Sequence, residues 1–393
     1  MKLMSVEAAR AAMLAEVAPL GLETVALAQA VGRVLRQDVA AVRDQPPFTN
    51  SAMDGWALRA SSSPQSLEIV GESAAGHGFE SELQPGQAVR IFTGAALPAG
   101  TDSVVIQEDA ARDGNRLSVP ASQPGDNIRR AGKDFRTGDV LLKAGTRIDP
   151  WRLSLAASAG RAEVVVAARP RIAILSTGEE IVEAPDTPGP FQIYDSGSPA
   201  LLAMVEAWGG TATKRSGIRD RLDAVIAAMR DADCDLIVTL GGASVGDHDL
   251  VRTAALELGL RYCVESVAVR PGKPTFFGVL TDGRRLLGLP GNPASAFVCA
   301  ELFLKPLIAA YCGAATEPVM QVAPLAVSLP ANGPREHWMR AKIAADGTVT
   351  PYGDQDSSLV SVFAGADALL RRKSRAQAVS ASETVDILRL VRG

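Results

Sequence analysis

The sequence predicts a multidomain α/β plus β fold, with a central three-layer α/β/α domain, a small inserted β domain and a C-terminal β-barrel-like domain. Three observations support this prediction. From Arg171 onward, short β-branched apolar runs alternate with helical patterns, as in a mainly parallel sheet covered by helices. Residues 41–130 show only short alternating runs broken by glycine and proline. The same short β pattern returns after Tyr311.

The N-terminal third predicts a β domain inserted into a linker region. An amphipathic helix is expected over Ser5–Ala18, and acids within its apolar pattern exclude a signal peptide. Residues 131–170 contain turn signals and a helix that ends at Gly160. We expect this segment to pair with residues 22–40, which makes the β domain between them an insertion.

The central domain is expected to alternate strands and helices. Its elements are predicted at IAIL (172–175), a helix over 199–208, TKRSGI (213–218), a helix over 221–230, LIVTL (236–240) and a helix from Leu250. The apolar segment 293–315 contains Glu301 and Lys305 in a favourable helical spacing, which favours a buried helix over a membrane span. The predicted domains are 1–40 plus 131–170, with the first helix packing on the central domain, then 41–130, 171–318 and 319–393.

Composition excludes several classes of function. The chain has 393 residues, 47% of them hydrophobic, and its net charge of −4 is not that of a nucleic-acid-binding protein. Its four cysteines are far apart, without a C-x-x-C pair, and only three histidines could join them. A zinc or iron–sulfur site is therefore not expected, and reduced thiols indicate the cytoplasm.

A glycine loop follows the predicted strand 236–240. Gly241, Gly242 and Gly246 allow close approach of the backbone to a ligand, and the loop leads into a helix N-terminus that attracts anions. Asp247 and His248 stand where a nucleoside-triphosphatase loop requires Lys and Ser or Thr. The loop therefore predicts phosphate binding without triphosphatase activity.

Two further loops belong to the same region. Arg270 and Lys273 flank a rigid Pro-Gly turn, and the string LPGNP (289–293) precedes a long helix. In an open α/β sheet such loops gather at the carboxyl ends of the strands, where ligands bind. Each loop alone is equally explained as a tight turn, and each cation as a solvated surface charge.

Acidic residues also cluster at predicted strand ends. They are Glu179 and Glu180, Asp220, and Asp247 and Asp249. Asp220 and Asp249 each precede a helix, so either is also a candidate N-cap. Because acids repel a phosphate unless a cation lies between them, we expect Mg²⁺ here, with Glu180 and Asp249 as its favoured ligands.

Several strings together resemble the molybdopterin molybdenumtransferase family, which includes MoeA and the gephyrin E-domain. They are NSAMDGWA (50–57), STGEE (176–180), YDSGS (194–198), GGASVGDHD (241–249), RPGKP (270–274) and LPGNP (289–293). The resemblance covers nearly the whole chain. It implies the last step of molybdenum cofactor synthesis, in which molybdate is inserted into adenylylated molybdopterin and AMP is released.

The resemblance also implies site residues. It assigns catalytic roles to Asp54, Glu180, Asp220 and Asp249, although Asp54 alone would read as a turn former. The substrate-binding positions it implies are Thr93, Asp134, Thr177, Gly178, Asp195, Gly241, Gly242, Ser244, Gly246, Arg270, Lys273, Pro290, Gly291, Asn292, Pro293 and Arg340. The chain departs from the family at Arg270, where Lys is usual, at Gly197, where Asn is usual, and at Gln355-Asp356-Ser357, where Gln-Gly-Ser is common.

The expected partners follow from the same resemblance. They are a second copy of the chain, in a homodimer with composite sites, a molybdopterin adenylyltransferase that hands over substrate, and molybdoenzymes that receive product. Nucleic acid and membrane are not expected. Two alternatives remain open: a molybdopterin adenylyltransferase, which typically has Gly-Gly-Thr-Gly in the glycine loop and lacks flanking β domains, and a non-catalytic scaffold like the gephyrin E-domain. The sequence does not distinguish molybdate from tungstate, since both are tetrahedral dianions of similar size.

Overall fold

The computed structural model describes residues 3–241 and 249–390, which separate into two compact units. One unit combines the residues up to Glu23, Gly32–Arg36 and the chain from Val165 onward. The other combines Thr24–Val31 with Gln37–Val164. The chain therefore passes between the units more than once, and the division into four domains stays a prediction.

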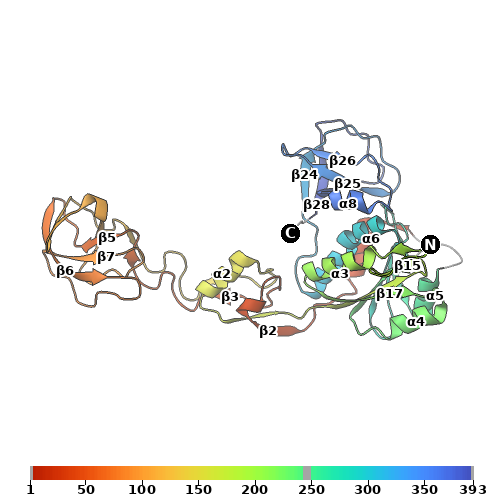
Figure 1. Ribbon diagram of the computed structural model, residues 1–393, viewed down its shortest axis with the longest axis horizontal. Coiled ribbons are helices and arrows are strands. Elements are labelled where there is room, and N and C mark those ends of the chain that lie inside the picture. Colours follow the sequence, from red (N-terminus) through yellow and green to blue (C-terminus); the bar gives the residue numbers. More distant parts are fainter. Residues whose placement is uncertain (1–2, 242–248, 391–393) are drawn as a thin grey trace. The chain divides into compact units, whose positions relative to one another are not determined.

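A six-stranded sheet forms the centre of the first unit (Figure 1). Its order is β17 (Thr211–Ile218), β14 (Arg171–Thr177), β18 (Leu236–Leu240), β23 (Arg285–Leu289), β22 (Phe276–Val279) and β19 (Arg261–Val264). The first four strands run parallel, whereas β22 and β19 are joined by antiparallel pairing. The prediction of a mainly parallel sheet is confirmed.

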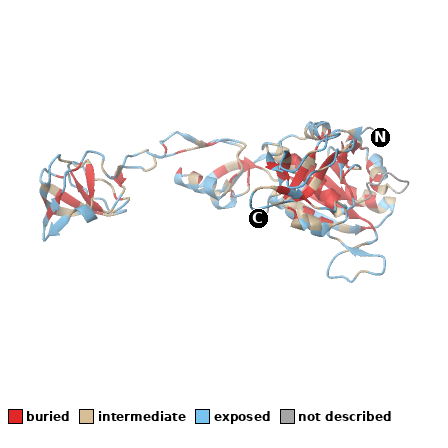
Figure 2. Ribbon diagram, turned by 90° about the horizontal axis from the view of Figure 1, so that it is seen from above, coloured by how far each residue is buried: buried red, intermediate tan, exposed pale blue. Residues whose placement is uncertain are grey.

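Helices cover both faces of this sheet. On one face lie α1 (Val6–Leu14), α3 (Gly197–Ala207) and a continuous helix made of α6 (Pro293–Cys299), the π-helical η3 (Ala300–Leu304) and α7 (Lys305–Tyr311). On the other lie α4 (Leu222–Arg230) and α5 (Leu250–Glu257) (Figure 1). Ile172 and Ile174 face the first helical layer, and Ala173 and Leu175 face the second. This burial on both faces explains why the strands are continuously apolar, and Figure 2 shows their buried residues.

The helix over Pro293–Tyr311 is long and apolar enough to cross a membrane by length and composition. However, 83% of its most apolar window is buried inside the protein. It shares one buried hydrophobic core with Met13 from α1 and with Leu388 near the C-terminus. It is therefore the core helix that the sequence predicts.

A second sheet belongs to the C-terminal region. Its order is β21 (Val269–Arg270), β25 (Glu336–Ile343), β27 (Ala368–Arg372), β28 (Thr384–Arg389) and β24 (Met320–Pro324), and β26 (Val349–Pro351) also pairs with β25. The short helix α8 (Val360–Gly365) follows β26. Because β21 comes from the central domain and pairs with β25, this sheet is anchored to the turn that follows β21.

Minor pairings complete the first unit. β1 (Leu3–Met4) pairs with β20 (Ser266–Val267), and β15 (Ile181–Val182) pairs with β16 (Ile193–Tyr194). The first helix ends at Leu14, so the expectation that it extends to Ala18 is wrong. Helix α3 begins at Gly197, two residues earlier than predicted, and a Cβ at Gly197 would lie 2.2 Å from Leu240 Cδ2. Close packing against β18 thus accounts for glycine at this position.

The second unit contains a six-stranded β sheet. Its order is β8 (Ser103–Ile106), β5 (Gly55–Leu58), β7 (Gln87–Ile91), β6 (Gln65–Ser73), β10 (Arg116–Val119) and β9 (Ala111–Asp113), with short 3₁₀ helices η1 (Leu27–Gln29) and η2 (Gln107–Asp109) elsewhere in the unit. Apolar side chains that include Trp56, Leu58 and Leu117 form its core.

Three two-stranded pairings lead into and out of this sheet. They join β4 (Asn50–Ser51) to β11 (Ile128–Arg129), β3 (Val39–Ala40) to β12 (Val140–Leu142), and β2 (Leu22–Ala26) to β13 (Glu163–Ala167). The expected pairing of residues 22–40 with the segment after the insertion is thus present. Helix α2 (Pro150–Ser158) is capped by Asp149 and is followed by Gly160 at φ +83°.

Candidate functional site

Three loops converge at the carboxyl edge of the central sheet. They follow β14 (Thr177, Gly178), β18 (Gly241) and β23 (Pro290–Pro293). A Cβ at Gly241 would lie 3.0 Å from the Thr177 carbonyl oxygen, and one at Gly291 would lie 3.3 Å from the Gly241 Cα. The backbones therefore touch through positions that only glycine fills without displacement, as the loop strings predict.

Part of the predicted glycine loop lies outside the described residues. Gly242, Ser244 and Gly246 belong to this stretch, as do Asp247 and His248. Their predicted role in binding phosphate stays a prediction.

Asp249 is the N-cap of α5. One of its carboxylate oxygens accepts from the Arg252 backbone N–H at 2.9 Å, and the other lies 2.9 Å from Arg252 Nε. Burial raises the pKa of Asp249 above its usual range, despite the opposing effect of Arg252. Arg252 also donates to the carbonyls of Glu265 and Pro274. Asp249 thus fixes the end of the Arg270–Pro274 turn through Arg252, and a role as metal ligand stays a prediction that must compete with this ion pair.

Glu180 and Asp220 follow adjacent strands, β14 and β17. The Asp220 carboxylate accepts from the Glu179 backbone N–H at 3.4 Å. The N-cap of α4 is Arg221, so the capping alternative for Asp220 is wrong. The exposed Glu180 carboxylate lies over Gly178, where a Cβ would be 2.5 Å from one of its oxygens. Within residues 3–241 and 249–390, no group of three or more His, Cys, Asp or Glu side chains is arranged to hold a metal ion.

Asp195 organises the start of α3. One carboxylate oxygen accepts from the backbone N–H groups of Gly197 and Ser198, at 3.1 and 2.9 Å, and the other accepts from Ser216 Oγ at 2.6 Å. Burial alone would raise the pKa of Asp195, but these hydrogen bonds bring it below its usual range. The side chain therefore has a structural role, whatever it contributes to a ligand.

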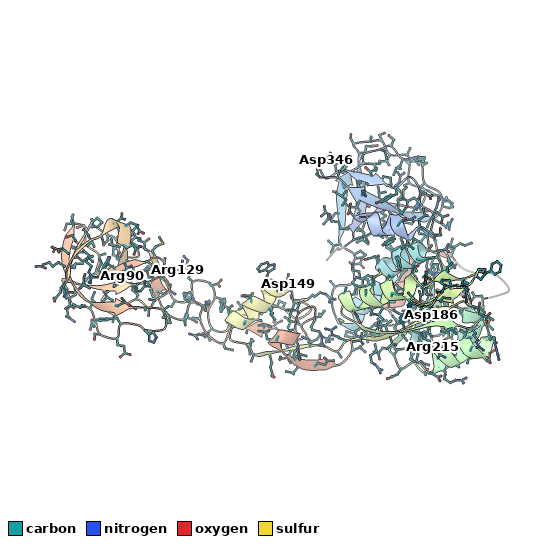
Figure 3. All side chains as sticks on the ribbon, viewed as in Figure 1. Arg90, Arg129, Asp149, Asp186, Arg215 and Asp346 are labelled. Carbon is teal, nitrogen blue, oxygen red and sulfur yellow. The ribbon has the colours of Figure 1, made fainter. Side chains whose placement is uncertain are left out.

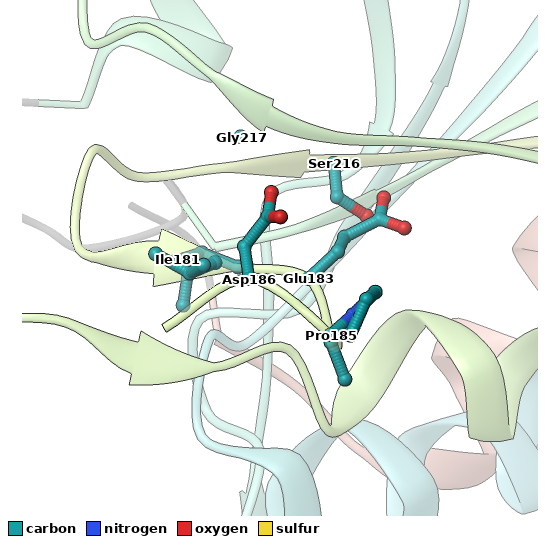
Figure 4. A pocket seen from close by; sticks show the side chains of 8 residues that line it. Ile181, Glu183, Pro185, Asp186, Ser216 and Gly217 are labelled. Carbon is teal, nitrogen blue, oxygen red and sulfur yellow. The ribbon is translucent and has the colours of Figure 1, made fainter. Parts of the chain in front are cut away.

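A cavity of about 550 Å³ lies at β15 and the segment that follows it (Figure 4). It is lined by Ile181–Asp186, Ser216 and Gly217, and contains none of the predicted site residues. Its wall carries two acids, Glu183 and Asp186, of which Glu183 is paired with Lys214 at 2.6 Å. Carboxylates without a free cation are unsuited to a phosphate, so this cavity is not the predicted anion site.

The two cations of the predicted anion site are accessible. Arg270 and Lys273 are both exposed, and neither forms an ion pair with any residue that the structure describes. Arg270 lies at the end of β21, opposite His337 of β25. Burial and the neighbouring charges of Arg270 and Arg340 lower the pKa of His337 to about 4, so its ring is neutral at pH 7.

Arg340 is the most unusual charged residue of this region, because its side chain is fully buried at 0% exposure. One guanidinium nitrogen donates to the Asp356 carbonyl at 2.7 Å, whereas Nε and Nη1 have no hydrogen-bond partner among the described residues. Burial lowers the pKa of Arg340, with the charges of Asp354 and Asp356 opposing this effect. A buried cation with two unused nitrogens can bind an anion only if the protein that covers it moves away, because both nitrogens are inaccessible here.

The turn around Ser357 connects Arg340 to the loop after β23. Asn292 Nδ2 donates to Ser357 Oγ at 2.8 Å, and the Ala294 N–H donates to the Ser357 carbonyl at 3.2 Å. The Asp356 carboxylate is occupied within its own turn, where it accepts from the N–H and hydroxyl of Ser358. The substitution of Asp for Gly at 356 is therefore compatible with this connection, which the sequence did not reveal.

The second unit brings together two of the predicted residues. Asp54 accepts from the backbone N–H and the hydroxyl of Thr93, both at 2.7 Å, and these two bonds hold the pKa of Asp54 below its usual range. Asp134 is exposed, and its backbone N–H donates to the Gln45 carbonyl at 2.9 Å. The Asp54–Thr93 pair is thus a preformed feature of this unit.

Sequence reasoning missed several residues that contact the predicted ones: Arg252, His337 and Ser357. Arg252 stands three positions after the N-cap Asp249, which is a spacing that could have revealed the ion pair. His337 and Ser357 become notable only through pairing between segments that are far apart in the chain.

Comparison with known proteins covers most of the chain. The MoeA N-terminal region (domain I and II) matches residues 4–160, a probable molybdopterin binding domain matches 173–310, and the MoeA C-terminal region (domain IV) matches 322–390. A molybdopterin molybdenumtransferase from Bacillus subtilis is 34% identical over 384 residues, covering 93% of this chain and 89% of that protein. One from Nostoc is 36% identical over 331 residues, covering 81% and 76%.

A solved structure agrees with these sequence matches. The crystal structure of a molybdopterin biosynthesis MoeA protein from Pyrococcus horikoshii superimposes with a TM-score of 0.81 at 29% identity, covering 99% of both chains.

Proposed function

The chain belongs to the MoeA family of molybdopterin molybdenumtransferases, which insert molybdenum during molybdenum cofactor biosynthesis, and on this premise we propose how its residues divide the task. The loops after β14, β18 and β23 bind the pterin and phosphates of adenylylated molybdopterin. Molybdate binds at the Arg340 guanidinium, which is fully buried in this structure and must become accessible for the anion to reach it. Lys273 and Arg270, which are both exposed, bind the negative charges of these ligands.

The observation that supports this division is the turn that contains Asp356 and Ser357. Its first residue accepts a hydrogen bond from Arg340, and the next contacts Asn292 in the loop after β23. A pterin on that loop and an oxyanion at Arg340 would therefore be held by neighbouring residues. Molybdate supplies the acceptor oxygens that the two unused nitrogens of Arg340 require.

Glu180 and Asp220 are the ligands that we propose for a bound Mg²⁺. Their carboxylates lie on adjacent loops, and neither forms an ion pair with a described Lys or Arg. Oxygen ligands of this kind, together with substrate phosphates, are what Mg²⁺ prefers. The ion would neutralise phosphate charge as the phosphoanhydride is cleaved and AMP leaves. Asp249 would act mainly by positioning α5 and Arg252, or as a further ligand if its ion pair opens.

We propose a catalytic role for Asp54, which belongs to the second unit. Hydrogen bonds from Thr93 keep its carboxylate ionised and oriented. We place it at the active site of a second copy, in a homodimer with two composite sites. We further propose a cytoplasmic enzyme, since its four cysteines are free. It would receive substrate from an adenylyltransferase and pass product to molybdoenzymes.

One assay tests the proposal. Purified protein is given adenylylated molybdopterin, molybdate and Mg²⁺, and AMP release and molybdenum transfer are measured. Wild type should perform both, and Glu180→Gln should bind substrate without turnover, because the amide keeps the shape but loses the charge. Glu183→Gln is the matched control, since Glu183 is paired with Lys214 beside the acidic cavity. Turnover by Glu180→Gln at the control rate would remove Glu180 from the site.

A further inference from the structure

Arg90 stands at the centre of the contacts that hold Asp54. It lies on β7 of the second unit (Figure 3), two residues before the turn that carries Thr93. One of its guanidinium nitrogens donates to the Gly55 carbonyl at 3.0 Å, directly after Asp54. The other donates to Gln107 Oε1 at 2.6 Å.

Gln107 in turn contacts the backbone of Asp54. Its backbone N–H donates to the Asp54 carbonyl at 3.1 Å. Arg90 therefore joins three segments that meet around Asp54: residues 54–55, the Thr93 turn and the start of η2. The Asp54 side chain itself is bound only through Thr93 among the described residues.

Two aromatic rings fix the Arg90 side chain. Its guanidinium carbon lies 5.2 Å from the centre of the Trp56 ring and 4.9 Å from that of Phe92. The planar guanidinium stacks well on aromatic faces, and such contacts restrict the rotation of the side chain. The charge of Arg90 also contributes to lowering the pKa of Asp54, after the larger effect of the two Thr93 hydrogen bonds.

From these contacts we propose that Arg90 is a positioning residue for the reaction, which fixes the place of the Asp54 carboxylate. The inference rests on the proposed catalytic role of Asp54. Arg90 does not touch substrate; it acts by holding Gly55 and Gln107 in place. A displacement of a catalytic group by about 1 Å can lower a reaction rate about a hundredfold. Removing the contacts of Arg90 should therefore lower turnover more than it weakens substrate binding.

The test compares Arg90→Met with Arg112→Met in the full-length protein. Arg112 also lies over Trp56, at 5.9 Å, but it donates to Gly114 and makes none of the contacts around Asp54. We expect Arg90→Met to lower kcat about tenfold or more while KM for adenylylated molybdopterin stays within about twofold. Arg112→Met should match wild type, and Arg90→Lys, which keeps the charge, should recover part of the activity.

A spectroscopic measurement separates positioning from a general loss of stability. The NMR signal of the Thr93 amide reports its bond to Asp54, and its titration midpoint reports the pKa of Asp54. In Arg90→Met this midpoint should rise and the signal should move toward that of a solvent-exposed amide. Gln107→Leu removes one partner of Arg90 with less disturbance, and it should shift kcat and the Thr93 signal in the same directions.

The outcomes separate the two proposals. If Asp54→Asn is inactive while Arg90→Met and Gln107→Leu match Arg112→Met in kcat and in the Thr93 signal, the positioning role is wrong and the role of Asp54 stands. If Asp54→Asn retains full activity, the proposed role of Asp54 fails, and the inference about Arg90 fails with it.

Discussion

Replacing Arg340 with methionine should stabilise the ligand-free protein and abolish its response to molybdate. The guanidinium is fully buried, has one hydrogen bond to the Asp356 carbonyl and leaves two nitrogens without described partners. Losing a hydrogen bond from a charged group costs about 1.5–3 kcal/mol, whereas each buried unsatisfied nitrogen costs about 1–3 kcal/mol. Methionine fills a similar length without charge, so the net gain in unfolding free energy should be about 2 kcal/mol.

Chemical denaturation with and without molybdate measures both effects. At a molybdate concentration a hundred times its Kd, wild type should gain about 2.7 kcal/mol, because the ligand binds only the folded state. Arg340→Met should gain nothing. Arg372→Met is the control: Arg372 is also buried in the C-terminal sheet, but its Nη2 donates to the carbonyls of Pro330 and Gln377, and only its Nη1 is buried without a partner among the described residues.

The control should be destabilised and should retain its response to molybdate. If Arg340→Met were instead less stable than wild type without ligand, the guanidinium must have partners that satisfy it. If it still gained stability from molybdate, the oxyanion must bind elsewhere. Either result would refute the assignment of Arg340 as the molybdate-binding cation.

Three further predictions concern pH, phosphate binding and subunit assembly. The pKa of His337 is about 4 in the folded protein and 6.5 for the unperturbed group, so the unfolded chain takes up a proton first as pH falls. The free energy of unfolding should therefore be unaffected above pH 6.5 and should fall by about 3 kcal/mol between pH 6.5 and 4. Urea denaturation should show this decrease in wild type but not in His337→Gln. Lys273→Ala should weaken the binding of adenylylated molybdopterin by about 1.5–3 kcal/mol, which is the contribution of a hydrogen bond to a charged group, and should leave the melting temperature unchanged. If a calorimetric titration shows unchanged affinity, Lys273 is not part of the site. Asp54→Ala and Glu180→Ala homodimers should each be inactive. When equal amounts of the two variants exchange subunits, half the dimers are mixed and each mixed dimer keeps one intact site, so about a quarter of wild-type activity should return. If no activity returns at any mixing ratio, both residues belong to a site within one subunit.

The sequence predicted those features that depend on local pattern. Continuous apolar strands such as Leu236–Leu240 and the glycine loops that follow them identified the α/β sheet and its carboxyl edge. The resemblance to a known family supplied Asp54 and Thr93 as separate residues, and the structure joins them by hydrogen bonds. The N-terminal helix was predicted too long because apolar residues continue beyond Leu14, although the backbone turns away there.

Features that depend on distant segments were beyond the sequence. The pairing of β21 with β25 places Arg270 opposite His337, and no periodicity in either segment indicates that register. The contact between Asn292 and Ser357 joins residues 65 positions apart. The capping alternative for Asp220 was reasonable from its position before a helix, but the chain places Arg221 at the cap and turns Asp220 toward Glu179.

The apolar helix over Pro293–Tyr311 has a consequence for how the chain is made. The buried core that it belongs to draws on both ends of the sequence, with Met13 in the first helix, Leu369 in β27 and Leu388 in β28. During synthesis the helix therefore emerges before part of its covering layer exists. Because exposed apolar surface promotes aggregation, the interval until β27 and β28 are synthesised is the period of greatest risk, and a chain truncated before Leu369 would carry that exposed surface permanently.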